Sequence, residues 1–122
     1  MAAVESKMDN MDFAKYFEWV YNTPYTGPYG VTFKVYAKEG QMEKYKECLF
    51  KVLTYELPPN SKKSDGPFED IVNENVIWLL EKWSSTAAIK AHWDKYKDDE
   101  TMKELMAQID VVQIAVYKLN EF

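Results

Sequence analysis

The segment over residues 76–83 constrains the fold of this chain more than any other. It reads Val-Ile-Trp-Leu-Leu-Glu-Lys-Trp, so apolar residues occupy both of its alternating faces. A nearly continuous apolar run of this length is typical of a strand whose two faces are both covered. The sequence therefore predicts a central strand here, with other parts of the protein packed over each face.

The segments around this strand alternate between strand-like and helix-like patterns. Residues 31–37 are rich in β-branched and aromatic side chains, which predicts a strand. Apolar residues at helical spacing over 42–53 predict a helix, which must end before Pro58 and Pro59. After a polar loop, a short second strand is expected over 68–72. A helix capped by Ser84 or Ser85 is predicted next, and it runs to Tyr96. A short helix capped by Asp98 or Asp99 follows, with Ile109 on its apolar stripe. The last predicted element is a strand over 111–119.

The order of these elements is strand, helix, strand, strand, helix pair, strand. This is the β-α-β-β-α-β order of the ferredoxin-like fold, an α+β class with one antiparallel sheet and helices on one face only. Residues 76–83 and 111–119 carry apolar side chains on both alternations, so the face without helices is also apolar. Because soluble monomers rarely expose such a patch, we expect two copies to stack these faces in a homodimer.

An extra helix is predicted ahead of this domain. Residues 9–21 place aromatic and aliphatic side chains at helical spacing after Asp9 or Asn10, either of which can cap the helix. Residues 22–30 contain two prolines and two glycines, which favours a loop. We therefore divide the chain into an N-terminal extension, 1–29, and a ferredoxin-like domain, 30–122. Tyr25 and Tyr29 in the loop could form a lid over a pocket or an arm that contacts a dimer partner.

Composition excludes several classes of function. The net charge is −5, arginine is absent and the lysines are scattered, so no nucleic-acid partner is expected. A single cysteine, Cys48, rules out an intrachain disulfide and a cysteine-rich metal site. No apolar run approaches the roughly 20 residues of a membrane helix, and the first residues do not resemble a signal peptide. We expect a cytoplasmic protein with no membrane partner and no metal.

The stretch over residues 81–92 reads Glu-Lys-Trp-Ser-Ser-Thr-Ala-Ala-Ile-Lys-Ala-His. It resembles the segment of the antibiotic biosynthesis monooxygenase family in which a Glu-x-Trp strand end leads into a helix that carries a histidine. The opening strand followed by Lys-Glu-Gly at 38–40 and a helix is also similar to that family's start. The resemblance covers roughly residues 30–119. It implies the dimeric α+β barrel architecture, in which two ferredoxin-like domains pair.

The resemblance also implies an activity. Members of this family oxidise quinols and polyketide anthrones with dioxygen and need neither metal nor flavin, because the deprotonated substrate itself reduces dioxygen. The protein must then exclude water, place a proton and stabilise an anion, and base catalysis of this kind contributes roughly 10²–10⁴-fold. The expected partners are thus a small, apolar, aromatic substrate and dioxygen.

Three residues are the candidate catalytic group. His92 is the one histidine and has an ordinary pKa near neutrality, so it could act as a base or hydrogen-bond partner for a hydroxyl; a core histidine is the alternative. Trp83 and Glu81 lie two residues apart on one strand and share a sheet face. They could supply a stacking indole and a carboxylate that orients His92 or the substrate. The alternative is a core tryptophan and a glutamate that caps the next helix.

Aromatic residues supply the candidate substrate-binding walls, since they combine a large apolar body with specific contact geometry. The candidates are Phe33, Tyr36, Trp78, Trp93, Tyr96 and Tyr29. Each could instead be an ordinary core residue. The predicted function is a cofactor-independent monooxygenase acting on an anthrone or quinol. A polyketide cyclase or isomerase on the same scaffold, or a ligand-binding protein without chemistry, remains an alternative.

Overall fold

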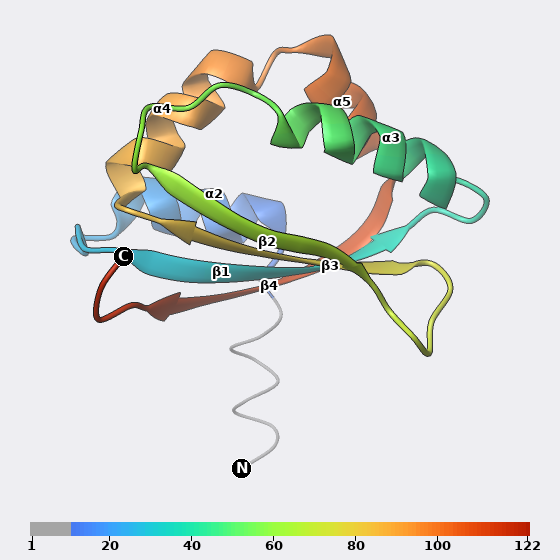
Figure 1. Cartoon of the computed structure of the whole chain (residues 1–122), viewed down its shortest axis with the longest axis horizontal. Helices are drawn as coiled ribbons and strands as arrows, with labels where there is room; N and C mark the ends of the chain where they lie inside the picture. The colour runs from blue at the N-terminus through green and yellow to red at the C-terminus, as the bar shows by residue number, and fades with distance from the viewer. Residues whose placement is uncertain (1–10) are drawn as a thin grey trace.

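The computed structural model describes residues 11–122 as one antiparallel sheet with helices packed on a single face (Figure 1). The spatial order of the strands is β2-β3-β1-β4. This arrangement confirms the predicted α+β, ferredoxin-like fold. The elements are α2 (Phe13–Asn22), β1 (Tyr29–Ala37), α3 (Met42–Leu53), β2 (Lys62–Glu69), β3 (Val76–Trp83), α4 (Thr86–Tyr96), α5 (Glu100–Ala107) and β4 (Ile109–Lys118). No helix among residues 11–122 is long and apolar enough to cross a membrane.

Local capping fixes where three of the helices begin. Ser85 accepts a hydrogen bond from the backbone N–H of Ala88, and Asp99 caps α5 in the same way, as two of the predicted alternatives require. Asp12 caps α2 by accepting from the N–H of Lys15 at 2.8 Å. The expected caps Asp9 and Asn10 lie outside the described residues, and the helix begins later than predicted because Asp12 satisfies its first free donors.

The sequence-based prediction of the second strand, over residues 68–72, was wrong. The strand spans Lys62–Glu69, whereas residues 70–75 form the turn into β3 and leave Ile71 and Val72 99% and 82% exposed. Asp70 builds this turn by accepting hydrogen bonds from the backbone N–H groups of Val72 and Asn73, each at 2.8 Å. Strand β2 forms an edge of the sheet, and an edge strand tolerates the polar sequence Lys-Lys-Ser-Asp-Gly of residues 62–66, which predicted a loop.

Strand β1 begins at Tyr29, so the prediction that Tyr29 belongs to a loop that could act as a lid was also wrong. Its side chain is fully buried, and its hydroxyl lies 2.8 Å from the hydroxyl of Tyr16 in α2. The next residue, Gly30, faces the other side of the sheet under Tyr117. A Cβ on Gly30 would lie 2.2 Å from the Tyr117 ring, so any larger residue there would displace that ring.

Helix α2 contributes to the same core as the sheet. Tyr16 and Val20 are buried with residues of β1, β3, β4 and the other helices. The pairing of β1 with β3 sets Val31 opposite Glu81 and Phe33 opposite Leu79. Because side chains alternate between faces, the odd-numbered residues of both strands point toward the helices. The space between this face and the helices contains a cavity.

Candidate functional site

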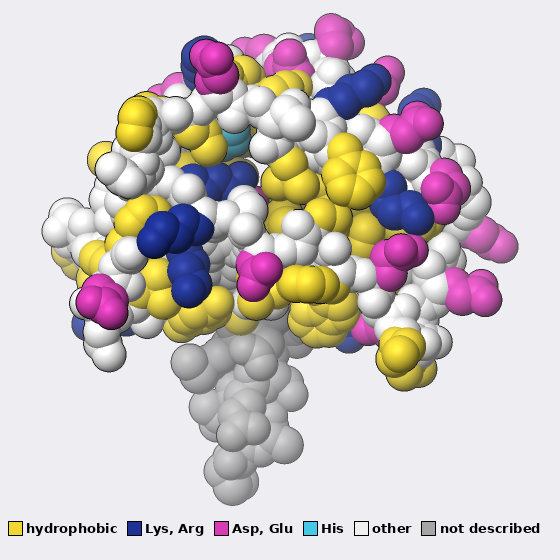
Figure 2. Space-filling model, in the orientation of Figure 1, with side chains coloured by type: hydrophobic (Ala, Val, Ile, Leu, Met, Phe, Trp, Pro, Cys, Tyr) yellow, Lys and Arg dark blue, Asp and Glu magenta, His cyan; other side chains and the backbone are white. Residues whose placement is uncertain are grey.

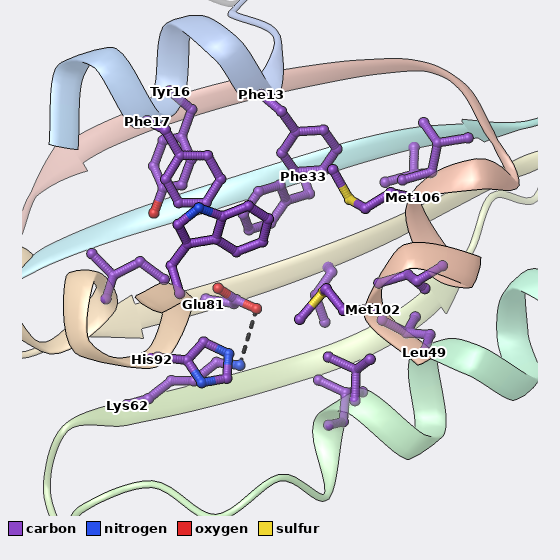
Figure 3. Close-up of a pocket in the computed structure, with 18 of the residues that line it drawn as sticks. Phe13, Tyr16, Phe17, Phe33, Leu49, Lys62, Glu81, His92, Met102 and Met106 are labelled. Atoms are coloured by element: carbon purple, nitrogen blue, oxygen red, sulfur yellow. Dashed lines mark ion pairs between the residues drawn. The ribbon is translucent and has the colours of Figure 1, made fainter. Parts of the chain in front are cut away.

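A small cavity lies between the helix-covered face of the sheet and the helices α2 to α5. Its volume is about 100 Å³, and Figure 2 shows a hollow beneath the helices in which the histidine colour is visible. Most of the lining is aromatic or aliphatic, as expected for a small-molecule site. Three polar side chains, Lys62, Glu81 and His92, meet in one corner of it (Figure 3).

A buried ion pair forms the first part of this corner. Lys62 Nζ in β2 lies 3.2 Å from Glu81 Oε2 in β3, and the two side chains are only 9% and 10% exposed. The other carboxylate oxygen accepts a hydrogen bond from Trp83 Nε1 at 3.0 Å. Lys62 Nζ also lies 5.2 Å from the centroid of the Trp83 ring. The indole, carboxylate and ammonium therefore hold one another in place.

His92 forms the second part of the corner. Its side chain is buried, and Nδ1 has no hydrogen-bond partner among residues 11–122. Burial, together with the Lys62 and Lys95 cations, lowers the pKa of His92 to about 4, and the nearby Glu81 carboxylate opposes this shift. The imidazole is thus neutral at pH 7 and presents an unused nitrogen inside a largely apolar cavity. An unpaired buried polar atom is costly, and a ligand hydroxyl would satisfy it.

Aromatic side chains from α2 and α4 form the wall opposite the sheet. Phe17 stacks on Trp93 with ring centroids 4.5 Å apart, and Phe13 lies 6.0 Å from Phe33. Phe13 and Phe17 lie in the helix predicted over residues 9–21, which was assigned to an extension, so neither was predicted as a cavity residue. Lys62 was not predicted as a cavity residue because the polar edge strand was interpreted as a loop.

Five of the predicted residues are brought together in the cavity. They are His92, Trp83, Glu81, Phe33 and Trp93. The carboxylate of Glu81 bonds to Trp83 and Lys62, and no hydrogen bond joins it to His92 in the described structure. Glu81 therefore positions the indole and the ammonium. The helix cap proposed as its alternative role belongs to Ser85.

The other predicted aromatic residues lie outside the cavity lining. Tyr36 and Trp78 point to the opposite face of the sheet, where Lys34 Nζ lies 5.3 Å and 5.2 Å from their ring centroids. Tyr96 lies behind His92 and stacks on Tyr55 at 4.3 Å. Tyr29 is buried beneath α2. Because side chains along a strand alternate between the two faces of the sheet, Tyr36 and Phe33 lie on opposite faces. The pattern of aromatic residues alone did not show which of these faces the helices cover.

No group of three or more His, Cys, Asp or Glu side chains suited to a metal ion occurs within residues 11–122. The charged groups that act on the pKa of His92 are Lys62, Glu81 and Lys95, and the first two already pair with each other. The polar side chains of the cavity can supply hydrogen bonding, proton placement and electrostatic stabilisation of a bound anion.

Comparisons with known proteins identify the fold. No protein-family model matches the chain, and no curated protein matches it either. A crystal structure from Chloroflexus aurantiacus J-10-fl, provisionally named an antibiotic biosynthesis monooxygenase, matches with a TM-score of 0.61 at 18% identity, covering 79% of this chain and 97% of that one. A protein from Caulobacter crescentus CB15 with the same provisional name gives 0.59 at 15% identity, covering 79% and 92%.

A third structure, a NIPSNAP family protein from Agrobacterium tumefaciens str. C58, matches with a TM-score of 0.58 at 10% identity and covers 93% of this chain and 96% of that chain. At these identities the likeness establishes a shared fold. The predicted resemblance to antibiotic biosynthesis monooxygenases is confirmed at that level. The chemistry must be argued from the cavity, since one fold hosts many reactions.

Proposed function

We propose that this protein is a cofactor-independent monooxygenase that oxidises an electron-rich aromatic substrate of the quinol or anthrone type with dioxygen. The observation that supports this proposal best is the neutral His92, which lines a largely apolar cavity beside a buried ammonium and whose buried Nδ1 has no hydrogen-bond partner among residues 11–122. The provisional names of two structures with this fold point to the same class of reaction.

The proposed step balances without any other reactant. Loss of a proton from an activated ring carbon gives an anion that transfers electrons to dioxygen and forms a new carbon–oxygen bond. For a methylene substrate the oxygen–oxygen bond then breaks, one oxygen stays as a carbonyl and the other leaves as water with the two hydrogens. The carbon loses four electrons and dioxygen gains four. In this scheme the protein binds the ring, excludes water and holds the hydroxyl or keto oxygen.

The size of the cavity limits how the substrate binds. Engineered apolar cavities of about 150 Å³ accept a benzene molecule, so a volume of about 100 Å³ takes a single ring only if the lining side chains move or part of the ring extends outside it. We therefore expect one ring to lie against Trp83 and Phe33, with any further rings outside the cavity. Single-ring quinols fit this cavity better than three-ring anthrones.

The test is the mass of the product after incubation with quinols, anthrones and uncyclised polyketide mimics, under air and under nitrogen. We expect a gain of oxygen in air only, and a loss of at least about tenfold in rate for His92→Ala. Lys97→Ala is the matched control, because Lys97 ends the same helix with a half-exposed side chain away from the cavity. Turnover that does not depend on dioxygen would instead indicate a cyclase or isomerase, and binding without turnover a ligand-binding protein.

We further propose that the protein acts as a homodimer that pairs through the face of the sheet without helices. On this face Val111, Tyr117 and Phe68 are 47%, 42% and 48% exposed. These residues lie on β4 and β2, so the apolar surface extends across the width of the sheet. Two such faces packed together would remove it from water.

A further inference from the structure

We infer that Lys62 is an anion-binding residue of the cavity and that the ligand is an ionisable hydroxy-aromatic compound bound as its oxyanion. This inference rests on the proposed function in one respect, because it assigns an aromatic ligand to the same cavity. It goes beyond it by naming Lys62 as the residue that binds the oxyanion and selects the ionised form of the ligand.

The first argument is the unused hydrogen-bonding capacity of Lys62. An ammonium group carries three N–H donors, and the ion pair with Glu81 Oε2 at 3.2 Å uses one of them. The side chain is 9% exposed, so bulk water does not surround the other donors. Lys62 is the one lysine that lines this cavity in the described part of the chain. A ligand oxygen would satisfy donors that the protein leaves free.

The second argument is the placement of Lys62 and His92 around one indole ring. Lys62 Nζ lies 5.2 Å from the Trp83 ring centroid, and the His92 ring centroid lies 5.7 Å from it. Figure 3 shows the two side chains converging on the same corner of the cavity beside Glu81. A ring that lies against the cavity wall can thus direct a single oxygen to both groups.

The third argument concerns the low basicity of His92. An imidazole whose pKa is about 4 is a weak base, so it takes a proton from a phenol only at a large cost in free energy. It remains a good hydrogen-bond partner at neutral pH. A buried cation next to the hydroxyl removes this difficulty, because it lowers the pKa of the hydroxyl itself. The Lys62 charge already lowers the pKa of His92, so its electrostatic effect extends to the imidazole.

Glu81 explains how a lysine can stay charged at this site without a ligand. Its carboxylate compensates the ammonium, while the N–H of Trp83 bonds to one of its two oxygens. The empty site is therefore electrically balanced. A ligand oxyanion would share the ammonium with Glu81, and this sharing is strongest in a closed, apolar cavity where charges are poorly screened.

The test uses 4-nitrophenol, a single-ring phenol whose anion absorbs visible light, and 4-nitroanisole, its methyl ether, which cannot ionise. Both are titrated into the protein under nitrogen, so no turnover is needed. For the wild-type protein we expect the bound phenol to ionise at least about one pH unit below the free phenol. We also expect the phenolate to bind at least about tenfold more tightly than the ether.

Substitutions assign the effect to Lys62. Lys62→Met should abolish the shift in ionisation yet keep the binding of 4-nitroanisole. Lys63→Met is the matched control, because Lys63 is the next residue of β2, faces the other side of the sheet and lies outside this cavity. It should retain the full shift. Lys62→Met leaves the negative charge of the buried Glu81 carboxylate without its cation. The measurement is therefore repeated with the double variant Lys62→Met, Glu81→Gln, in which both charges are removed.

Each outcome decides the inference. A bound phenol that ionises at the same pH as the free phenol or higher, an ether that binds as well as the phenolate, or a shift that survives in both Lys62 variants would overturn it. The result is independent of the oxidation assay. A shift without oxygen incorporation would keep the anion site and reject the monooxygenase, whereas oxygen incorporation without a shift would do the reverse.

Discussion

The two faces of the sheet use alternate residues of the same strands but differ in what covers them. The face toward the helices buries Trp83, Glu81 and Phe33 around a cavity. The opposite face carries Trp78 and Tyr36 beneath Lys34, with apolar side chains left partly exposed at its edges. Each face thus contains a tryptophan, a second aromatic residue and a lysine. Lys62 on the covered face is buried and ion-paired, whereas Lys34 on the open face has no such ion pair in the described structure.

This difference shows that residue type alone does not identify a binding site in a sheet of this kind. An amino group above two aromatic rings on an open face is hydrated, and its interaction with the rings is weak. The ammonium of Lys62 is enclosed and paired with a carboxylate, and its charge helps to lower the pKa of the neighbouring His92. Four predictions follow this contrast from the largest expected effect to the smallest.

The largest effect should come from removing the tryptophan on the helix-covered face. Trp83→Ala deletes a side chain that is 1% exposed and is expected to lower the free energy of unfolding by about 3–5 kcal/mol. Trp78→Ala, on the open face, should cost only about 1 kcal/mol. Urea denaturation of both variants measures this contrast, and equal losses would show that the open face is as closely packed as the covered one.

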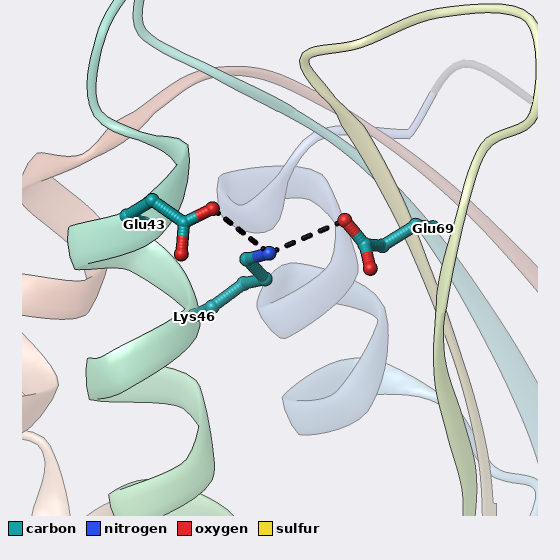
Figure 4. Close-up of polar contacts among 3 residues, drawn as sticks. All are labelled: Glu43, Lys46 and Glu69. Carbon is teal, nitrogen blue, oxygen red and sulfur yellow. Dashed lines mark hydrogen bonds and ion pairs between the residues drawn. The ribbon is translucent and has the colours of Figure 1, made fainter.

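The second prediction compares a buried ion pair with an exposed one. Glu81→Gln leaves the Lys62 ammonium without its carboxylate and should cost about 3 kcal/mol of unfolding free energy. The control is Glu69→Gln. Lys46 bridges Glu43 and Glu69 at 3.0 Å and 3.2 Å on the surface, as Figure 4 shows, and water screens these charges. The control should unfold at nearly the same urea concentration as the wild type; a comparable loss there would contradict the distinction.

The third prediction concerns self-association through the open face. Val111→Glu places a charge on that face and should weaken the proposed homodimer by about tenfold or more in dissociation constant, equivalent to about 1.4 kcal/mol. Ile71→Glu is the matched control, because Ile71 is 99% exposed in the turn before β3, outside the strands. Sedimentation equilibrium of both variants measures the effect. A wild-type protein that stays monomeric at all concentrations would remove the basis for the homodimer.

At neutral pH the smallest effect should come from the ionisation of His92, which changes the stability only as the pH falls. Its pKa is about 4 in the folded protein against an ordinary value of 6.5, so below pH 6.5 the unfolded chain binds a proton that the folded protein does not. The stability contributed by the neutral imidazole is therefore present above pH 6.5 and is lost as the pH falls toward 4. Urea midpoints across this range should decline less for His92→Gln than for the wild type, and parallel declines would place the His92 pKa near its ordinary value.

The fold was predictable from the sequence because most of its signals are local. The apolar run over Val76–Trp83 predicts the central strand, and a hydroxyl or carboxylate before an apolar stripe predicts the starts of α4 and α5. Strand β2 was not predictable in this way. Its residues are polar because it lies at the sheet edge, and its strand conformation depends on pairing with β3.

The candidate site was predictable only in part, for a similar reason. His92, Trp83 and Glu81 lie close together in the sequence, so their proximity follows from one strand and the helix after it. Lys62 and Phe17 reach the same cavity through long-range pairing and packing, which no local pattern specifies. Whether Phe33 or Tyr36 faces the cavity depends on which side of the sheet the helices cover, a property of the whole fold.

The way in which α2 joins the molecule has a consequence for how fast a ligand exchanges. This helix covers the cavity through ring contacts and the hydroxyl contact between Tyr16 and Tyr29, and it adds no strand to the sheet. Its opening would therefore leave the four paired strands intact, although it would expose the buried Tyr16 and Val20. We expect the backbone amides of α2 to exchange with deuterium faster than those of β1, and a bound ligand to slow that exchange. The rate at which α2 opens would then govern the residence time of a ligand in the cavity.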